Sequence, residues 1–243
     1  ATGNLWIGTT NGLNVFNKER KAFCRISLQG EDVGLKARYL INTVFYDSAY
    51  NNLWVGTKNG LYRASLTGYR AMNGEQLAFK HFTHNSNNQH SLDDNDVSSI
   101  FSDVKGHIWI GSAGKHLNRF IRESETFERI FIDVEEAFEL GHLPKSILVD
   151  EKDDFWIGND LSKLVYWDRK RNIFELITST ENSIPIFDLY LDDDQTKWVA
   201  TDGYGLYILD KKGNILQHIE NDSAVPFSLP NNQPSKILQD DEG

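Results

Sequence analysis

Hydrophobic and polar residues alternate in short runs along most of this chain, and one run recurs around a tryptophan. Each copy has an aliphatic residue beside the tryptophan, then glycine or alanine, then a small polar residue. The five copies are LWIGT at 5–9, LWVGT at 53–57, IWIGS at 108–112, FWIGN at 155–159 and KWVAT at 197–201. Alternation with a period of two over so short a run predicts a β-strand.

The tryptophan run returns at intervals that vary by a few residues. The five repeat tryptophans follow one another after 48, 55, 47 and 42 residues. They are Trp6, Trp54, Trp109, Trp156 and Trp198. A variable interval places the insertions in loops between conserved structural units, so the chain is predicted to hold five tandem copies of one unit.

Three more strands are predicted around each tryptophan strand. An alternating run that ends in an acidic turn precedes it, as in Val97 to Asp103, and a short turn follows it, such as Asn11-Gly12. Asn-Gly favours a tight hairpin because both turn positions require positive φ. The next strand begins with leucine, as at Leu117, and the last contains a phenylalanine in the first four repeats, as at Phe127, and runs from Ile215 to His218 in the fifth. Each unit is therefore predicted to form four antiparallel strands.

The repeat predicts an all-β fold, a β-propeller of four-stranded antiparallel blades. One such sheet cannot bury both of its faces alone, so neighbouring copies must stack, and stacking around an axis protects the sheet edges. A tryptophan at a fixed strand position can fill the wedge between adjacent blades. The glycine or alanine that follows lets the neighbouring sheet approach closely.

Residues 1–243 are predicted to form one propeller. The blade-like repeats lie around 1–35, 36–90, 91–141, 142–182 and 183–227, with 228–243 as the first strand of a further or ring-closing blade. Two arrangements are open, a closed five-bladed ring or part of a seven-bladed propeller. The abrupt start at Ala1, inside a blade, favours a piece cut from a longer chain.

Charge and composition exclude several classes of partner. Thirty-five acidic against 25 basic residues give a net charge of −10, which disfavours nucleic acid and anionic lipid surfaces. No run of 18 apolar residues occurs, so we expect no membrane contact by this stretch of chain. Cys24 is the only cysteine and can form no internal disulfide.

The motifs of enzyme active sites are absent from the sequence. There is no Gly-x-Ser-x-Gly elbow and no glycine-rich phosphate loop, and the histidines are scattered. The acidic runs 93–96 and 192–194 lack the rest of a calcium loop and are typical of turn caps. We therefore expect no catalytic residue, no metal ligand and no cofactor.

A ligand of a propeller is expected at the mouth of the central channel, where the loops leading into the first strand of each blade converge. These loops offer hydrogen-bonding groups and an aromatic face suited to a polyhydroxylated or anionic sugar. The candidate ligand-binding residues are Arg38, Tyr39, Asn95, Lys145 and Gln233.

The string LWIGTTNGLNVFN at 5–17 resembles the two-component regulator propeller repeat, and 53–63 resembles it equally. Later copies depart from the pattern: Ser112 replaces threonine, residues 113–116 lengthen the turn, residues 161–163 lack the turn glycine, and Ala200 replaces the motif glycine. The resemblance extends over essentially the whole chain and is specific for the repeat, not for any ligand.

This resemblance implies an extracytoplasmic sensor region of a hybrid two-component system, on the periplasmic or extracellular side of the inner membrane. In that family tandem propellers precede an immunoglobulin-like domain, a membrane span and a histidine kinase, and many members respond to oligosaccharides. It thus implies a non-catalytic ligand-sensing propeller, with an oligosaccharide ligand. The implied partners are a neighbouring propeller or immunoglobulin-like domain of the same receptor and a second copy in a homodimer. A kinase would lie outside this chain.

Two other functions are open. A protein–protein interaction scaffold should display an exposed apolar or aromatic patch on one face. A propeller lyase or hydrolase should gather His, Glu or Arg from several blades into the channel, and the loops into the first strands offer a single histidine, His142.

Overall fold

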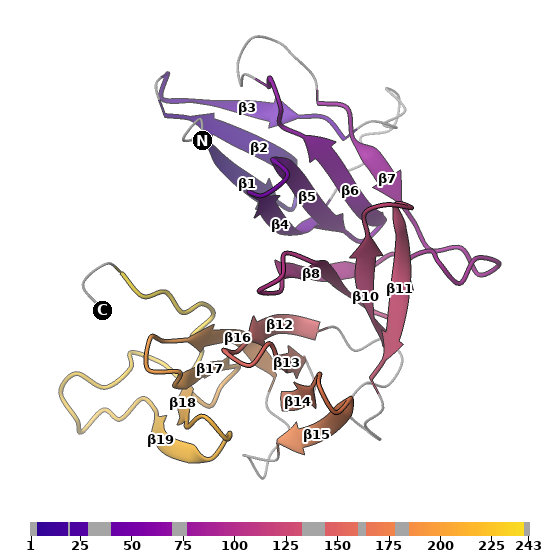
Figure 1. Ribbon diagram of the computed structural model, residues 1–243. Coiled ribbons are helices and arrows are strands. Elements are labelled where there is room, and N and C mark those ends of the chain that lie inside the picture. Colours follow the sequence, from indigo (N-terminus) through magenta and orange to yellow (C-terminus); the bar gives the residue numbers. More distant parts are fainter. Residues whose placement is uncertain are drawn as a thin grey trace. The chain divides into compact units, whose positions relative to one another are not determined.

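The computed structural model describes residues 4–18, 20–28, 40–69, 77–132, 144–159, 164–177 and 185–240. Every regular element within these ranges is a β-strand (Figure 1). The chain divides into two compact units, Ala1–Ile130 and Phe131–Gly243. Each unit is described by itself below.

The first unit contains three antiparallel sheets, each with its strands in chain order. The first sheet has three strands: β1 (Leu5–Thr9), β2 (Gly12–Asn17) and β3 (Ala22–Ile26). The second comprises β4 (Ile41–Asp47), β5 (Asn52–Thr57), β6 (Gly60–Ser65) and β7 (Lys80–Phe82), and the third β8 (Val97–Ser102), β9 (Ile108–Ser112), β10 (His116–Ile121) and β11 (Thr126–Phe131). Strand β4 packs against β8, so the first strands of successive sheets are neighbours.

The second unit repeats this arrangement in two four-stranded sheets. One comprises β12 (Pro144–Val149), β13 (Phe155–Asn159), β14 (Leu164–Asp168) and β15 (Ile173–Ile177), and the other β16 (Ile186–Leu191), β17 (Lys197–Thr201), β18 (Leu206–Leu209) and β19 (Ile215–Ile219). Here β12 packs against β16. The prediction of an all-β chain built from four-stranded antiparallel sheets is confirmed.

The segment 236–240 forms no strand, although its pattern resembles the first strand of a repeat. A strand requires a paired neighbour, and none of the described residues pairs with this segment through a backbone ladder. It lies instead beside β16, where the Ile237 amide donates to Asp188 Oδ2 at 2.9 Å and Tyr190 donates to Gln239 at 2.9 Å.

The motif glycines allow sheets to approach one another, as predicted. A Cβ placed on Gly56 would lie 2.7 Å from Val97 Cγ1, and one on Gly158 would lie 2.6 Å from Ile186 Cγ2. Both contacted side chains open the first strand of the next sheet. Any larger residue would force the two sheets apart.

Trp6, Trp54 and Trp156 each lie between two neighbouring sheets of their own unit, which agrees with the predicted packing role. Trp54 is fully buried in a cluster that includes Leu61 of its own sheet and Ile100 and Ile110 of the next. Trp156 occupies the same place in the second unit, beside Leu189 and Val199. Trp109 is also buried, whereas Trp6 and Trp198, in the first and last repeats, are only partly buried.

A hydrogen bond from the indole to the preceding acidic turn fixes the orientation of three of these rings. Nε1 of Trp109, Trp156 and Trp198 donates to Oδ2 of Asp103, Asp150 and Asp192 at 3.0, 3.1 and 2.9 Å. The other carboxylate oxygen of each aspartate accepts two backbone amides of its turn. One aspartate therefore closes the turn and fixes the orientation of the indole ring.

Candidate functional site

The predicted ligand-binding residues are divided between the two units. Asn95 lies in the first unit, in the loop before β8, while Lys145 and Gln233 lie in the second. Arg38 and Tyr39 lie outside the described residues. Their predicted role in ligand binding stays a prediction.

Every first strand of a four-stranded sheet has an irregularity after its opening residue. The register of pairing shifts between Ile41 and Thr43, Val97 and Ser99, Pro144 and Ser146, and Ile186 and Asp188. Such a bulge leaves one extra residue on the bulged strand and turns its side chain away from the regular alternation. Lys145 is the extra residue of β12, so its exposure follows from the bulge.

Asn95 supports its loop through its side-chain oxygen. Its Oδ1 accepts a hydrogen bond from the His84 amide at 2.7 Å, and its carbonyl accepts one from the Gly60 amide at 2.8 Å. The side-chain oxygen is thus engaged internally, and its amide Nδ2 is the group left to contact a ligand.

The loop containing Asn95 has a second copy near the C-terminal end, which the sequence analysis missed. Asn232 accepts the Asn221 amide through its side chain and the Gly205 amide, at 2.9 Å, through its carbonyl. The shared signal is Ser-Leu-x-x-Asn, present at 91–95 and 228–232. Asn232, rather than its neighbour Gln233, is the structural counterpart of Asn95.

Lys145 and Gln233 differ in whether their side chains are hydrogen-bonded within the protein. Within the described residues the Lys145 ammonium makes no hydrogen bond or ion pair, and the residue is exposed. Gln233 is also exposed, but its Nε2 donates to Asp202 Oδ1 at 2.8 Å. Lys145 is therefore the freer of the two to contact a ligand.

A buried carboxylate is hydrogen-bonded to Ser146, the residue that follows Lys145. Asp188, on β16, has a side chain only 4% exposed and accepts from Lys236 Nζ at 2.7 Å. Ser146 Oγ, on β12, donates to Asp188 Oδ1 at 3.2 Å and accepts from the Leu189 amide at 3.0 Å. These three polar side chains cross-link β12, β16 and the C-terminal segment.

This cluster is suited to positioning and hydrogen bonding rather than to nucleophilic chemistry. Activation of a serine requires a general base that is free to take its proton, and the hydroxyl of Ser146 donates to Asp188, a carboxylate that is already paired with Lys236. Within the described ranges, no three His, Cys, Asp or Glu side chains come together where they could hold a metal ion. Among the same residues no helix has the length and apolar character of a membrane span.

One stretch of the chain matches a known family. Residues 91–114 match the family described as two component regulator propeller. This stretch includes Asn95 and Trp109, and it supports the resemblance drawn from the repeat motifs. A search of curated proteins finds no match to the sequence.

Solved structures with a similar fold include extracellular domains of bacterial signalling proteins. The extracellular domain of BT4673 from B. thetaiotaomicron, described as a one component system, has a TM-score of 0.73 at 24% identity over 98% of this chain and 29% of that chain. The extracellular domain of the hybrid two component system BT3049 from the same organism has a TM-score of 0.58 at 20% identity over 98% and 36%. These likenesses confirm the propeller fold.

An enzyme shares the fold as well. Virginiamycin B lyase from Staphylococcus aureus has a TM-score of 0.67 at 13% identity, over 92% of this chain and 69% of that chain. This chain spans about a third of the length of the signalling domains it resembles. Fold alone therefore leaves both a sensor and an enzyme to be considered.

Proposed function

We propose, on the premise that residues 91–114 form a two component regulator propeller repeat, that this chain is a non-catalytic sensing propeller of a two-component signalling receptor. The match at 91–114 is the observation that carries the proposal. It is supported by the recurrence of the same tryptophan motif in the other four repeats. The receptor would place this propeller on the periplasmic or extracellular side of the inner membrane.

The proposed ligand is an oligosaccharide bound by loops at the first strands of the sheets. Lys145 supports this because its exposed ammonium is unengaged within the described residues, and Gln233 because its exposed carboxamide retains hydrogen-bonding capacity beyond its bond to Asp202. Sugar hydroxyls both donate and accept, so ammonium and carboxamide groups suit them. Arg38 and Tyr39 would add a charged donor and an aromatic face.

Titration of the full chain with a panel of oligosaccharides, followed by thermal unfolding, tests the proposal. A ligand present at 100 times its Kd stabilises the folded state by about 2.7 kcal/mol, which raises the unfolding temperature measurably. We expect at least one oligosaccharide to do so. In the Lys145→Ala variant the affinity should fall about tenfold or more, since a charge-assisted hydrogen bond is lost.

Lys170→Ala is the matched control, because Lys170 is also an exposed lysine of the second unit, in the turn between β14 and β15. It should bind as the unchanged chain does. Equal loss in both variants would place the ligand elsewhere. An oligosaccharide converted to product would favour the lyase or hydrolase alternative, and stabilisation by a protein partner but by no saccharide would favour the interaction scaffold.

Neighbouring domains of the receptor are the proposed protein partners, namely a second propeller, an immunoglobulin-like domain, or the same chain of a second protomer. Sedimentation of the intact extracytoplasmic region with and without a bound oligosaccharide tests the homodimer. A ligand-dependent change of mass supports it, whereas an unchanged monomer contradicts it.

A further inference from the structure

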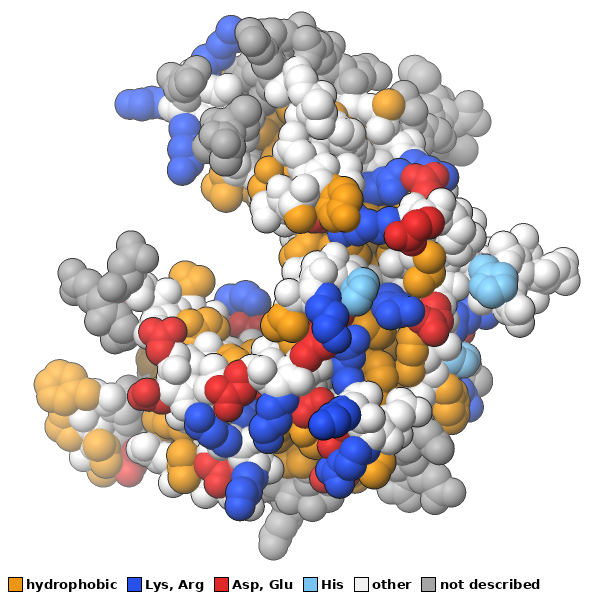
Figure 2. Space-filling view, in the orientation of Figure 1, with side chains coloured by type: hydrophobic (Ala, Val, Ile, Leu, Met, Phe, Trp, Pro, Cys, Tyr) orange, Lys and Arg blue, Asp and Glu red, His pale blue; other side chains and the backbone are white. Residues whose placement is uncertain are grey.

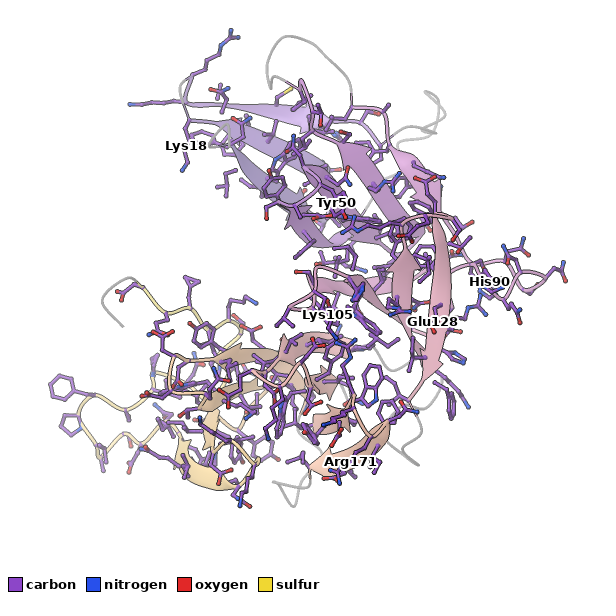
Figure 3. The ribbon with its side chains drawn as sticks, in the orientation of Figure 1. Lys18, Tyr50, His90, Lys105, Glu128 and Arg171 are labelled. Atoms are coloured by element: carbon purple, nitrogen blue, oxygen red, sulfur yellow. The ribbon has the colours of Figure 1, made fainter. Side chains whose placement is uncertain are left out.

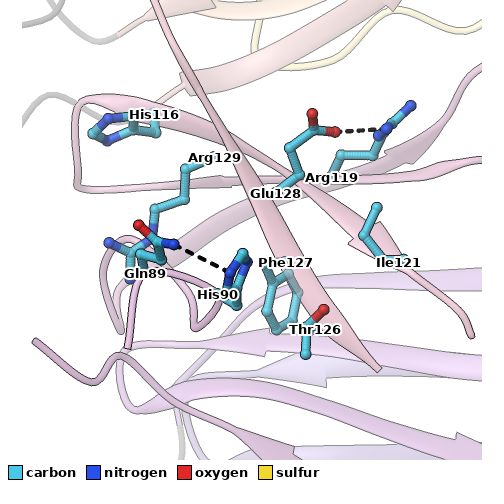
Figure 4. Close-up of a pocket in the computed structure, with 9 residues that line it drawn as sticks. All are labelled: Gln89, His90, His116, Arg119, Ile121, Thr126, Phe127, Glu128 and Arg129. Atoms are coloured by element: carbon cyan, nitrogen blue, oxygen red, sulfur yellow. Dashed lines mark hydrogen bonds and ion pairs between the residues drawn. The ribbon is translucent and has the colours of Figure 1, made fainter. Parts of the chain in front are cut away.

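The Ser-Leu-x-x-Asn loop that precedes β8 is covered by strand β11 of the third sheet (Figure 4). The Phe127 amide donates to the His90 carbonyl at 2.9 Å. Arg129 donates through Nε to the Ser91 carbonyl at 2.9 Å and through Nη2 to the Leu92 carbonyl at 2.7 Å. Under this cover Ser91 is only 8% exposed and Leu92 is fully buried. The covering strand therefore satisfies the carbonyls of the loop and buries its leucine.

The second copy of this loop, at 221–232, has the same internal hydrogen bonds. Ser228 Oγ accepts from the Asp222 amide at 3.1 Å and donates to the Asp222 carbonyl at 2.7 Å. Ser91 Oγ makes the same two bonds with Asn85, at 2.9 and 3.1 Å. A side chain that bonds to nearby backbone groups fixes a turn locally. The conformation of the loop is therefore set by its own sequence, whether or not a strand covers it.

The second copy has no covering strand among the residues that the structure describes. None of those residues donates to the carbonyls of Phe227 and Ser228, the counterparts of two that the first copy uses. Leu229, at the place of Leu92, is only partly buried. The Phe227 side chain is fully exposed, and its backbone has a φ of 72°, which a bulky residue rarely adopts. The second copy thus presents backbone acceptors and apolar side chains to a partner.

Strand β3 of the first sheet is the counterpart of β11. The ring centroids of Phe16 and Phe23 lie 4.8 Å apart with the planes tilted by 46°. Those of Phe120 and Phe127 in the third sheet lie 5.5 Å apart with a tilt of 56°. The two sheets share the runs Leu-Asn-x-Phe, at 13–16 and 117–120, and Phe-x-Arg-Ile, at 23–26 and 127–130. Arg25 therefore stands where the third sheet has Arg129.

Strand β3 is uncovered within the part of the chain that the structure describes. Phe23 is 65% exposed, whereas Phe127 is 2% exposed. Arg25 is also exposed, and its guanidinium donates to none of the described residues. Aromatic residues and arginine are among the types enriched at protein interfaces. The strand thus offers the groups that the second loop lacks.

The loop and the strand also carry opposite charges. The stretch 18–25, which leads into and includes the start of β3, has four basic residues and one acidic residue. Its basic side chains project from the first sheet in Figure 2, and Lys18 is labelled in Figure 3. The stretch 220–232 contains Glu220 and Asp222 and no basic residue. Attraction between these charges would orient the two surfaces as they meet.

We propose that the loop at 221–232 docks on strand β3 of a second copy of this chain, in the way that the first loop docks on β11. Arg25 of the second copy donates to the loop carbonyls from the place of Arg129, and Phe227 gains a cover from Phe23. The two surfaces differ, so the contact is heterologous, and each copy can bind one neighbour by its loop and another by its strand. The contact needs no ligand and does not depend on the proposed sensing.

One hydrogen bond of the first loop cannot be repeated in this contact. The Asp93 amide donates to Asn118 Oδ1 at 2.9 Å, but Pro230 stands at the place of Asp93 and has no N–H. The docked loop therefore has at least one bond fewer than the loop at 84–92. We expect an association that depends on protein concentration.

Sedimentation equilibrium of the full chain without any saccharide tests the proposal. The mean mass should rise above that of one chain as the concentration increases. Arg25→Gln should weaken the association by about tenfold or more, because charge-assisted hydrogen bonds are lost. Phe227→Asn should also weaken it, while the loop keeps its backbone because asparagine tolerates positive φ. A monomer at every concentration would overturn the second copy as the occupant and would leave the loop to another domain of the receptor.

Lys115→Gln is the matched control. Lys115 is an exposed residue of the first unit in the turn before β10, outside both proposed surfaces. The variant removes the same charge as Arg25→Gln, so its association should stay within about twofold of that of the unchanged chain. Equal weakening by the two variants would show that net charge rather than the arginine contact controls the association, and would overturn the proposal.

Mixing the two weakened variants tests whether the contact joins unlike surfaces. The Arg25→Gln chain keeps an intact loop, and the Phe227→Asn chain keeps an intact strand β3. An equimolar mixture should therefore form pairs at concentrations where each variant alone is monomeric, and such pairing supports docking of the loop on β3. A mixture that stays monomeric there would contradict a heterologous contact.

Discussion

Trp54 and Trp109 occupy the same position in adjacent sheets, yet only one of them is hydrogen-bonded. Both are almost completely buried, at 0% and 2% exposure. Trp109 Nε1 donates to Asp103, whereas Trp54 Nε1 is buried and has no hydrogen-bond partner among the residues that the structure describes. The wedge between two sheets can therefore be filled by an indole whose polar group is left unsatisfied.

The length of the acidic turn explains the difference. Asp103 precedes Trp109 by six residues, but Asp47 precedes Trp54 by seven, and the extra residue carries the carboxylate out of reach. Asp47 instead accepts from Arg122 Nη2 at 2.8 Å, and the Arg122 guanidinium lies 3.8 Å from the centroid of the Tyr50 ring, labelled in Figure 3. The aspartate of the third sheet thus bonds an indole of its own sheet, whereas the aspartate of the second sheet pairs with an arginine that follows the third strand of the next sheet. Both indole rings are buried whether or not they are hydrogen-bonded, which indicates that packing of the ring is the shared source of stability in these repeats.

Asp103→Ala should produce the largest loss of stability in this comparison. The substitution removes the acceptor of Trp109 Nε1 and of the Lys105 and His107 amides, so we expect the free energy of unfolding to fall by about 3 kcal/mol. Although burial opposes ionisation, hydrogen bonds from His107 and Trp109 hold the pKa of Asp103 below its ordinary value. Its contribution is then present at neutral pH and is lost as the pH falls below about 4. Urea unfolding at pH 7 and pH 3 measures both effects.

Asp47→Ala is the paired control, because it removes an aspartate that accepts no indole. We expect a loss of about 1–2 kcal/mol from the Arg122 pair alone, since Asp47 is buried but the Arg122 guanidinium is 20% exposed and keeps its hydrogen bond to the Gly106 carbonyl. An equal loss in the two variants would mean that the indole bond is not what distinguishes the repeats.

Replacing each tryptophan by phenylalanine should lower the free energy of unfolding by amounts that differ less than those of the two aspartate variants. Phenylalanine keeps an aromatic filler but removes the indole N–H and part of the buried area. Trp109→Phe should cost about 2–3 kcal/mol, and Trp54→Phe about 1 kcal/mol less, because no hydrogen bond is lost with its unpaired Nε1. The midpoints of urea unfolding of the two variants give the difference. Identical costs would contradict it.

The strands of the fold could be predicted because their signals are local. Alternation and the turn residues place the tryptophan strands within a residue of where the structure has them, as at Leu5–Thr9 and Phe155–Asn159. The glycine after the tryptophan was correctly predicted to permit close approach, since only the absence of a side chain allows Val97 so near Gly56.

The sites could be predicted much less well because they depend on residues far apart in the chain. Asn95 was selected as a loop residue, but its bond to His84 and its link to Gly60 depend on how three segments meet. Arg129 carries no motif, and its hydrogen-bond partners are assembled only once the loop at 84–92 lies against β11. The Asp-to-Trp spacing was visible in the sequence, but its meaning requires the geometry of the turn.

The repeats also differ at the residue before the tryptophan, which is Lys197 in the last repeat. The other repeats have Leu5, Leu53, Ile108 and Phe155 there. Lys197 is only 2% exposed, and its Nζ lies 4.3 Å from the Trp156 ring centroid and donates to the Lys211 carbonyl at 3.1 Å. Among the described residues no carboxylate is in hydrogen-bond contact with its ammonium, and burial lowers its pKa from the ordinary value of 10.5.

Lys197→Met should therefore change stability least, and in a direction that depends on pH. At pH 7 the unchanged chain bears the cost of a buried charge, so the variant should be as stable or up to about 1 kcal/mol more stable. Because the pKa is lower in the folded than in the unfolded state, the unchanged chain gains stability as the pH rises through the folded value toward 10.5, and the difference should narrow. Urea unfolding at pH 7 and pH 10 tests this, with the exposed Lys212→Met as control. A loss of more than about 2 kcal/mol at pH 7 would show that the ring and carbonyl contacts outweigh the cost of burying the charge.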